Sequence, residues 1–135
     1  MEKEELLRLF ISLDFVTINP VVIIGYTIII LGDKRMVKHV ILWQLKDEFS
    51  AEQKAAIKAG VKANLESLQG KIPGLLEIKV NIEPLASSNV DMMLDSAFES
   101  EEALKGYAVH PEHVKVADTY VRPYTKARSC LDYEV

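Results

Sequence analysis

The chain alternates apolar and polar residues in four short segments, which is the pattern of β-strands with two different faces. In residues 36–46 (MVKHVILWQLK), the odd-numbered side chains from His39 to Leu45 share one face, and Val40 and Leu42 share the other. The same two-residue period recurs in three further segments, at 75–84, 89–100 and 126–135. Because apolar residues occur on both sides of these segments, we expect both faces of the sheet to be covered.

A helix is predicted between the first two strands, in residues 49–74. Its start carries a capping box, in which Ser50 and Gln53 exchange hydrogen bonds between side chain and backbone. Apolar residues then recur at spacings of four, four and three, at Ile57, Val61, Leu65 and Leu68. Gly70 suits the C′ position after the helix, where a positive φ is favoured.

The second helical segment follows the third strand and is broken by a proline. Ser100 is placed to cap its first turn, in which Glu101 also interacts favourably with the helix dipole. Pro111 disfavours helical geometry in the residue before it, so the first part of the segment must end there. His110 can then cap a new helix that has Pro111 at position N1. The apolar stripe of this new helix consists of Val114, Ala117 and Val121.

The order of these elements is β-α-β-β-α-β, which is the ferredoxin-like α+β arrangement. Two helices cover one face of a four-stranded sheet and leave the other face bare. An exposed apolar face of this size exceeds what soluble monomers usually tolerate. We therefore expect a symmetric homodimer in which two sheets pack face to face around a barrel-like interior, a dimeric α/β barrel.

Residues 1–35 differ in composition from the rest and are predicted to be an N-terminal extension of a domain at 36–135. Their apolar run from Phe15 to Leu31 is at the lower limit of the roughly 17 to 25 residues that cross a bilayer. Three interpretations stay open: translated upstream sequence, an added strand or arm, and a membrane anchor. The first is preferred because codons shortly before that of Met36 can contain a ribosome-binding sequence.

Composition and charge narrow the class of protein. The 135 residues are 49% hydrophobic and 27% charged, which fits one soluble globular domain. The net charge of −4, with acids and bases interspersed, argues against a nucleic-acid partner, because phosphate binding needs a clustered basic face. The single Cys130 excludes an internal disulfide and a Cys-based zinc site. We expect a buried structural thiol in a protein of the reducing cytoplasm.

Three stretches of residues 36–135 are distinctive in combination: MVKHVILWQLKDEFSAEQ, FESEEALKGYAVHPEHVKV and LDYEV. In this order they resemble the stress-responsive A/B barrel family, the dimeric α+β barrels. The resemblance covers essentially all of residues 36–135 and does not extend into residues 1–35. It implies a homodimer with a cavity between each sheet and its helices, and it does not imply any one activity.

The resemblance also points to candidate site residues. One plant member, of the olivetolic acid cyclase type, cyclises a linear polyketide without a cofactor by means of a tyrosine and a histidine. Tyr107 and His113 match that pair and are the candidate catalytic residues. His39 and His110 stand where the family also has histidines, and they are candidate substrate-binding residues.

The chemistry of the residues supports the same site. A neutral histidine can abstract a proton made acidic by a carbonyl group, and a tyrosine hydroxyl can donate to the developing enolate oxygen. His39 shares its strand face with Ile41 and Trp43, which are therefore predicted to bind substrate in an apolar cavity. The predicted function is binding of a small carbonyl-bearing molecule by a homodimer, with cyclase- or lyase-type proton transfer.

Two alternative functions stay open. One is a structural or stress-protective oligomer, in which the histidines are packing and capping residues. The other is a cofactor-free monooxygenase, because such enzymes share this fold class. A zinc site from His39, His110 and His113 is disfavoured because Pro111 places His110 at a helix cap. We expect no metal site and no cofactor.

Overall fold

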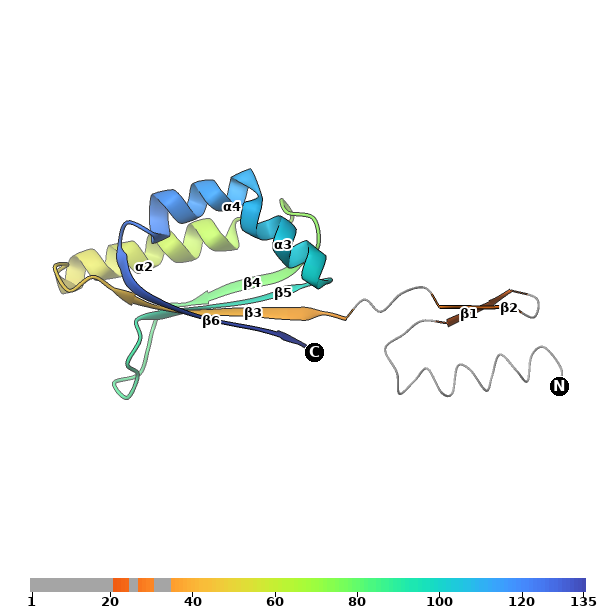
Figure 1. Cartoon of the computed structure of the whole chain (residues 1–135). Helices are drawn as coiled ribbons and strands as arrows, with labels where there is room; N and C mark the ends of the chain where they lie inside the picture. The colour runs from red at the N-terminus through yellow and green to blue at the C-terminus, as the bar shows by residue number, and fades with distance from the viewer. Residues whose placement is uncertain (1–20, 25–26, 31–34) are drawn as a thin grey trace. The chain divides into compact units, whose positions relative to one another are not determined.

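The computed structural model describes residues 21–24, 27–30 and 35–135. The chain divides into two units, Met1–Arg35 and Met36–Val135 (Figure 1). In the first unit, β1 (Val21–Ile24) and β2 (Thr27–Ile30) pair in antiparallel fashion. Apart from Arg35, the rest of this unit lies outside the described residues, so translated upstream sequence, an added strand or arm and a membrane anchor all stay predictions. In the described ranges, no helix combines the length and hydropathy that a membrane span requires.

The second unit is a four-stranded antiparallel sheet with its helices on one face (Figure 1). The strand order is β4-β5-β3-β6, so β3 pairs with both β5 and β6. Along the chain the elements are β3 (Val37–Leu45), α2 (Ala51–Glu66), β4 (Leu75–Asn81), β5 (Met92–Phe98), α3 (Glu101–Val109), α4 (Pro111–Val116), the π-helical turn η1 (Ala117–Val121) and β6 (Thr125–Glu134). The predicted ferredoxin-like α+β fold is confirmed, with the second helical segment divided into α3, α4 and η1.

The helices begin where the sequence predicts. At the start of α2, Ser50 Oγ accepts a hydrogen bond from the Gln53 N–H, and Gln53 Oε1 accepts one from the Ser50 N–H. Ser100 Oγ accepts a backbone N–H at the start of α3. The end of α2 comes earlier than predicted, at Glu66, and Gly70 adopts its φ of +83° in the turn that follows.

The core lies between the helices and the sheet face that they cover. The odd-numbered residues of β3 face the helices, and Ile41 and Leu45 are each 1% exposed. They pack in one cluster with Leu65 from α2, Phe98 from β5 and Tyr107 from α3. Full burial of each large apolar side chain contributes roughly 1.5–3 kcal/mol, so this layer is the main favourable contribution to the fold.

The opposite face of the sheet is covered by none of the described helices of this unit (Figure 1). Val40, Leu42 and Leu131 belong to it, because they alternate with the residues that face the helices. Lys38 and Asp95 form an ion pair on the same face. The face therefore combines apolar side chains with this charged pair.

Two glycines allow a matched test of how backbone conformation and local space affect stability. We expect Gly74→Ala to destabilise the domain by at least about 1–2 kcal/mol, because its φ of +79° is unfavourable for an L-residue and a Cβ would lie 2.4 Å from Ala103 Cβ. Gly106→Ala, within α3, should instead stabilise the domain by about 0.5–1 kcal/mol, because its Cβ meets no atom within 4 Å.

Urea unfolding of the two variants, followed by circular dichroism, measures both changes. The prediction requires free energies of unfolding that move in opposite directions. A change of the same sign in both variants would contradict it.

Candidate functional site

A cavity of about 200 Å³ lies between the helices and the sheet, and we call it the inner chamber. Its wall includes His39, Ile41 and Trp43 from β3, Tyr107 from α3 and His113 from α4. Five of the six predicted site residues therefore line one cavity. They converge because β3 supplies one face of the sheet and the break between α3 and α4 brings both helices over it.

Tyr107 and His113 stack against each other in the wall of this chamber. Their ring centroids are 4.0 Å apart, and the planes are inclined by 31°. Tyr107 is only 2% exposed. Among the described residues, neither Tyr107 Oη nor His113 Nδ1 has a hydrogen-bond partner, although both atoms are buried. These two buried polar atoms can therefore form hydrogen bonds with a ligand.

Burial sets the protonation states of these two groups. Loss of solvation lowers the pKa of His113, the backbone of Ala108 opposes this effect, and the nearby positive charge of Arg122 acts in the same direction as burial. The imidazole is therefore neutral at pH 7 and can accept a proton. Burial also raises the pKa of Tyr107, against a smaller opposing effect of the Arg128 charge. The Tyr107 hydroxyl stays protonated and can donate.

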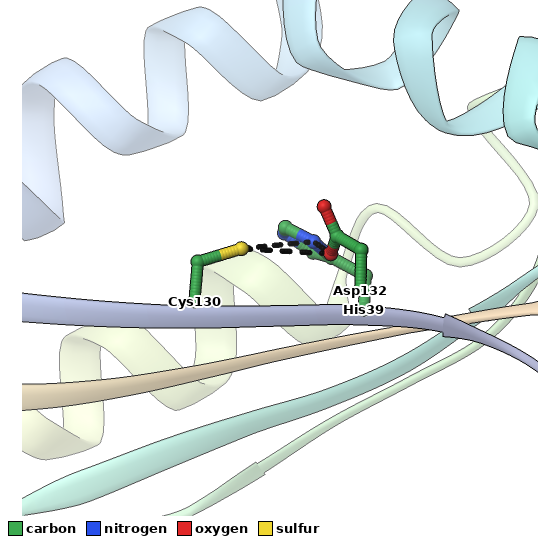
Figure 2. A group of neighbouring side chains, drawn as sticks. All are labelled: His39, Cys130 and Asp132. Carbon is green, nitrogen blue, oxygen red and sulfur yellow. Dashed lines mark hydrogen bonds and ion pairs between the residues drawn. The ribbon is translucent and has the colours of Figure 1, made fainter.

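His39 is held by neighbouring strands on both sides. On the β5 side, Ser96 Oγ donates a hydrogen bond to the His39 carbonyl oxygen at 2.8 Å. On the β6 side, His39 Nδ1 contacts Asp132 Oδ1 closely, as Figure 2 shows. Since a carboxylate accepts, we assign the proton to Nδ1, which leaves the lone pair on Nε2. The His39 ring lies edge-on to Tyr107, with 6.1 Å between the ring centroids.

A second, more open cavity of about 540 Å³ lies beside the inner chamber, and we call it the outer chamber. The two chambers share four wall residues, His39, Leu104, Ala108 and Arg128. The outer chamber also contacts β6 through Cys130 and Asp132. A ligand too large for the inner chamber can therefore extend into the outer one.

The inner chamber favours a negative charge. Its lining contains Arg122 and Arg128 beside the two histidines, and no carboxylate side chain among the described residues belongs to it. Arg122 is already paired with Asp118, one turn away on the same helical segment. Arg128 forms no ion pair with a described carboxylate within 4.0 Å, and its side chain lines both chambers.

His110 does not join the other predicted site residues. Its Nδ1 accepts a hydrogen bond from the Glu112 N–H at 3.1 Å and so caps α4, with Pro111 at the first helical position. The ring is not among those that line either chamber. This geometry gives His110 a capping role, and the substrate contact predicted for it stays a prediction.

The prediction of a buried thiol at Cys130 is wrong. Its side chain is exposed because β6 is an edge strand, and its sulfur lies near His39 and Asp132. Partial burial and the negative charge of Asp132 raise the pKa of the thiol, which is therefore not a reactive thiolate.

Sequence reasoning missed Arg128 and Asp132. The available signal was the alternation of side chains along β6. Its even-numbered residues face the helices, because Asp132 is opposite His39 and Arg128 is opposite Trp43 in the pairing with β3. The sequence shows which residues of β6 share a face. It does not show which of the two faces meets the chamber, because that depends on pairing with β3.

The sequence profile of one family, described as Stress Responsive A/B Barrel Domain, matches residues 37–135. No curated protein sequence matches the chain. Among solved structures, a dimeric protein of unknown function and ferredoxin-like fold from Bacteroides fragilis NCTC 9343 is 32% identical, with a TM-score of 0.70. The similarity covers 74% of this chain and 96% of the Bacteroides chain.

Two solved structures that are less similar in sequence carry the names of enzymes. The hydroxynitrile lyase of Passiflora edulis is 18% identical, with a TM-score of 0.60, and the match covers 76% of this chain and 95% of the lyase. An antibiotic biosynthesis monooxygenase-like protein from Nitrosomonas europaea is 14% identical, with a TM-score of 0.59 and coverage of 77% and 93%. At these identities the two structures show the shared fold alone.

The lowered pKa of His113 predicts how stability depends on pH. Below the ordinary pKa of 6.5, the unfolded chain takes up a proton at this position that the folded chain resists. The His113 contribution therefore makes the folded state less stable as the pH falls below 6.5. In urea unfolding from about pH 8 to pH 5, wild type should lose more stability than His113→Asn. Equal slopes for the two proteins would show that His113 is not buried as a neutral group.

Proposed function

This chain belongs to the stress-responsive A/B barrel domain family, and on that premise we propose that it is a cytoplasmic homodimeric enzyme of cofactor-free proton transfer. Its substrate is a small carbonyl-bearing organic molecule that binds in the inner chamber. The single observation that carries this proposal is the pair of buried polar atoms, Tyr107 Oη and His113 Nδ1, without a partner in one cavity wall.

Each residue of the site has a distinct role in this reaction. Neutral His113 removes a proton from the carbon next to the carbonyl group. Tyr107 donates its hydroxyl proton in a hydrogen bond to the oxygen on which negative charge develops. Arg128 stabilises that charge electrostatically, and His39 directs Nε2 toward the substrate while Asp132 holds Nδ1. Return of the proton from His113 to another carbon or oxygen, or loss of a leaving group, completes the reaction.

The dimensions of the chamber restrict the substrate. Its volume of about 200 Å³ is below the roughly 300–1,000 Å³ that is typical of sites for drug-sized ligands. The substrate must be smaller than such a ligand or extend past His39 into the outer chamber. The apolar wall formed by Ile41, Trp43 and Leu94 suits a hydrocarbon or aromatic body on the same molecule.

This function accounts for the wall of the chamber better than a purely structural role does. A buried polar group without a partner costs about 1–3 kcal/mol. A protein that served only as a protective oligomer would gain nothing from two such groups beside a cavity. The lyase-type reaction is preferred to oxidation because the site offers a base and a hydrogen-bond donor, which are the groups that enolisation needs.

Dimerisation follows from the uncovered sheet face. Val40, Leu42 and Leu131 lie together there and need a cover, and a second copy of the same face provides one by two-fold symmetry. The similar protein from Bacteroides fragilis is described as dimeric, which supports the proposal.

Proton exchange into a simple ketone tests the reaction. The full chain should accelerate loss of the α-C–H signal of cyclohexanone in D₂O, followed by ¹H NMR. His113→Asn should lower the protein-catalysed rate by about 10²–10⁴-fold because the base is lost. Tyr107→Phe should also slow exchange, since it removes the donor to the enolate oxygen.

His110→Asn is the matched control for this experiment. His110 lies outside both chambers, and asparagine is a good helix cap, so the exchange rate should equal that of wild type. The proposal fails if no protein exceeds the buffer rate, or if the variants at positions 113 and 110 have equal activity.

Sedimentation velocity of the full chain at micromolar concentration tests the dimer. Wild type should sediment as a dimer, and Leu131→Asp should weaken association at least about tenfold because a charge would be buried in the interface. Val109→Asp is the control, since Val109 is 76% exposed on α3, on the helical side of the sheet. A monomeric wild type, or equal weakening by both substitutions, would contradict the proposed interface.

A further inference from the structure

We propose that His39, Cys130 and Asp132 form a binding site for a transition-metal ion of the zinc type. Figure 2 shows the three side chains pointing toward one another from β3 and β6, on the helical side of the sheet. One ligand atom from each residue, Nδ1, Sγ and a carboxylate oxygen, lies within 4.8 Å of the other two. The inference goes beyond the proposed function, because it requires neither Tyr107 nor His113.

The strand register explains why these three donors meet. Asp132 lies directly opposite His39 in the antiparallel pairing of β6 with β3, and Cys130 lies opposite Ile41. Cys130 and Asp132 are two residues apart on one strand, so their side chains share a face. The positions of all three donors therefore depend on a hydrogen-bonded ladder rather than on a loop.

The distances are close to those of a tetrahedral site. Bonds of 2.0–2.3 Å from zinc to nitrogen, oxygen and sulfur place neighbouring ligand atoms about 3.4–3.6 Å apart. Cys130 Sγ lies 3.5 Å from Asp132 Oδ1 and 3.9 Å from His39 Nδ1. His39 Nδ1 and Asp132 Oδ1 are closer than this, since they contact each other directly, and a small rotation of the Asp132 side chain would separate them.

The ligand types select the class of ion. One thiolate, one imidazole and one carboxylate suit Zn²⁺ or Co²⁺ and do not suit Mg²⁺ or Ca²⁺, which take oxygen ligands. Three protein ligands leave a fourth position, and the outer chamber beside them has room for water or a ligand atom there. A single cysteine excludes zinc sites built from several cysteines, but it does not exclude a site that combines one cysteine with other ligands.

The charges around the site permit a cation. Among the described residues that line the outer chamber, Glu101, Asp132 and Glu134 are acidic, whereas Lys105 and Arg128 are basic. Binding would release the Cys130 thiol proton to solvent, while the proton of the neutral His39 ring would move from Nδ1 to Nε2, and no oxidation or reduction is involved. The ion would replace the direct contact between His39 and Asp132 and would link β3 to β6.

Titration of the full chain with Co²⁺ under reducing, thiol-free conditions tests the site. Because Cys130 is the only cysteine, a thiolate-to-cobalt charge-transfer band in the near ultraviolet can arise from no other residue. We expect the band to saturate at one Co²⁺ per chain and to disappear when Zn²⁺ displaces the cobalt. A wild-type protein without the band would overturn the proposal.

Three substitutions test whether Cys130 binds the ion together with His39 and Asp132. Cys130→Ser should abolish the band, and Asp132→Asn and His39→Gln should each weaken Co²⁺ binding at least about tenfold. Circular dichroism confirms that each variant is folded, and His110→Asn serves as the control with unchanged affinity. Equal affinity of wild type, Asp132→Asn and His39→Gln would show a solitary cysteine and reject the site.

The result is separable from that of the proton-transfer experiment. His113→Asn should bind Co²⁺ like wild type although it has lost exchange activity. If wild type catalyses exchange but gives no cobalt band, only the metal site is rejected. If wild type gives the cobalt band but does not catalyse exchange, only the proposed function is rejected.

Discussion

The pairing of β6 with β3 is the constraint on which the rest of the structure depends. It makes Asp132 the cross-strand partner of His39, and it turns alternate residues of an edge strand toward the helices. A register shift of one residue would place Leu131 beside His39 and would move Asp132 to the uncovered face. Both the chamber wall and the apolar surface of that face depend on the same ladder of hydrogen bonds.

The chamber itself results from a break in the second helical segment. Pro111 ends α3, and His110 caps α4, so two short helices replace a single straight one. Tyr107 from the first helix and His113 from the second then stack beside the sheet instead of lying on one continuous helix. Because these rings keep buried polar atoms without partners, the break reduces stability locally and leaves groups that a ligand can satisfy.

Local signals in the sequence predicted most of the fold. The capping box at Ser50, the cap at Ser100 and the proline at 111 act over a few residues, and the structure has each of them. The site was only partly predictable, because its remaining members depend on contacts between distant strands. Asp132 and Cys130 reach His39 across more than ninety residues of chain, and no local pattern shows which face of β6 meets the helices.

The two ring nitrogens of His39 link the two parts of the site. Nδ1 meets Asp132 and Cys130, Nε2 is the nitrogen that remains for a substrate, and the His39 side chain lines both chambers. With Asp132 as partner, Nδ1 carries the proton and Nε2 is a hydrogen-bond acceptor. With an ion on Nδ1, the proton must move to Nε2 for the ring to stay neutral, and the same nitrogen becomes a donor. An ion bound by His39, Cys130 and Asp132 would therefore reverse the polarity that His39 presents to a substrate.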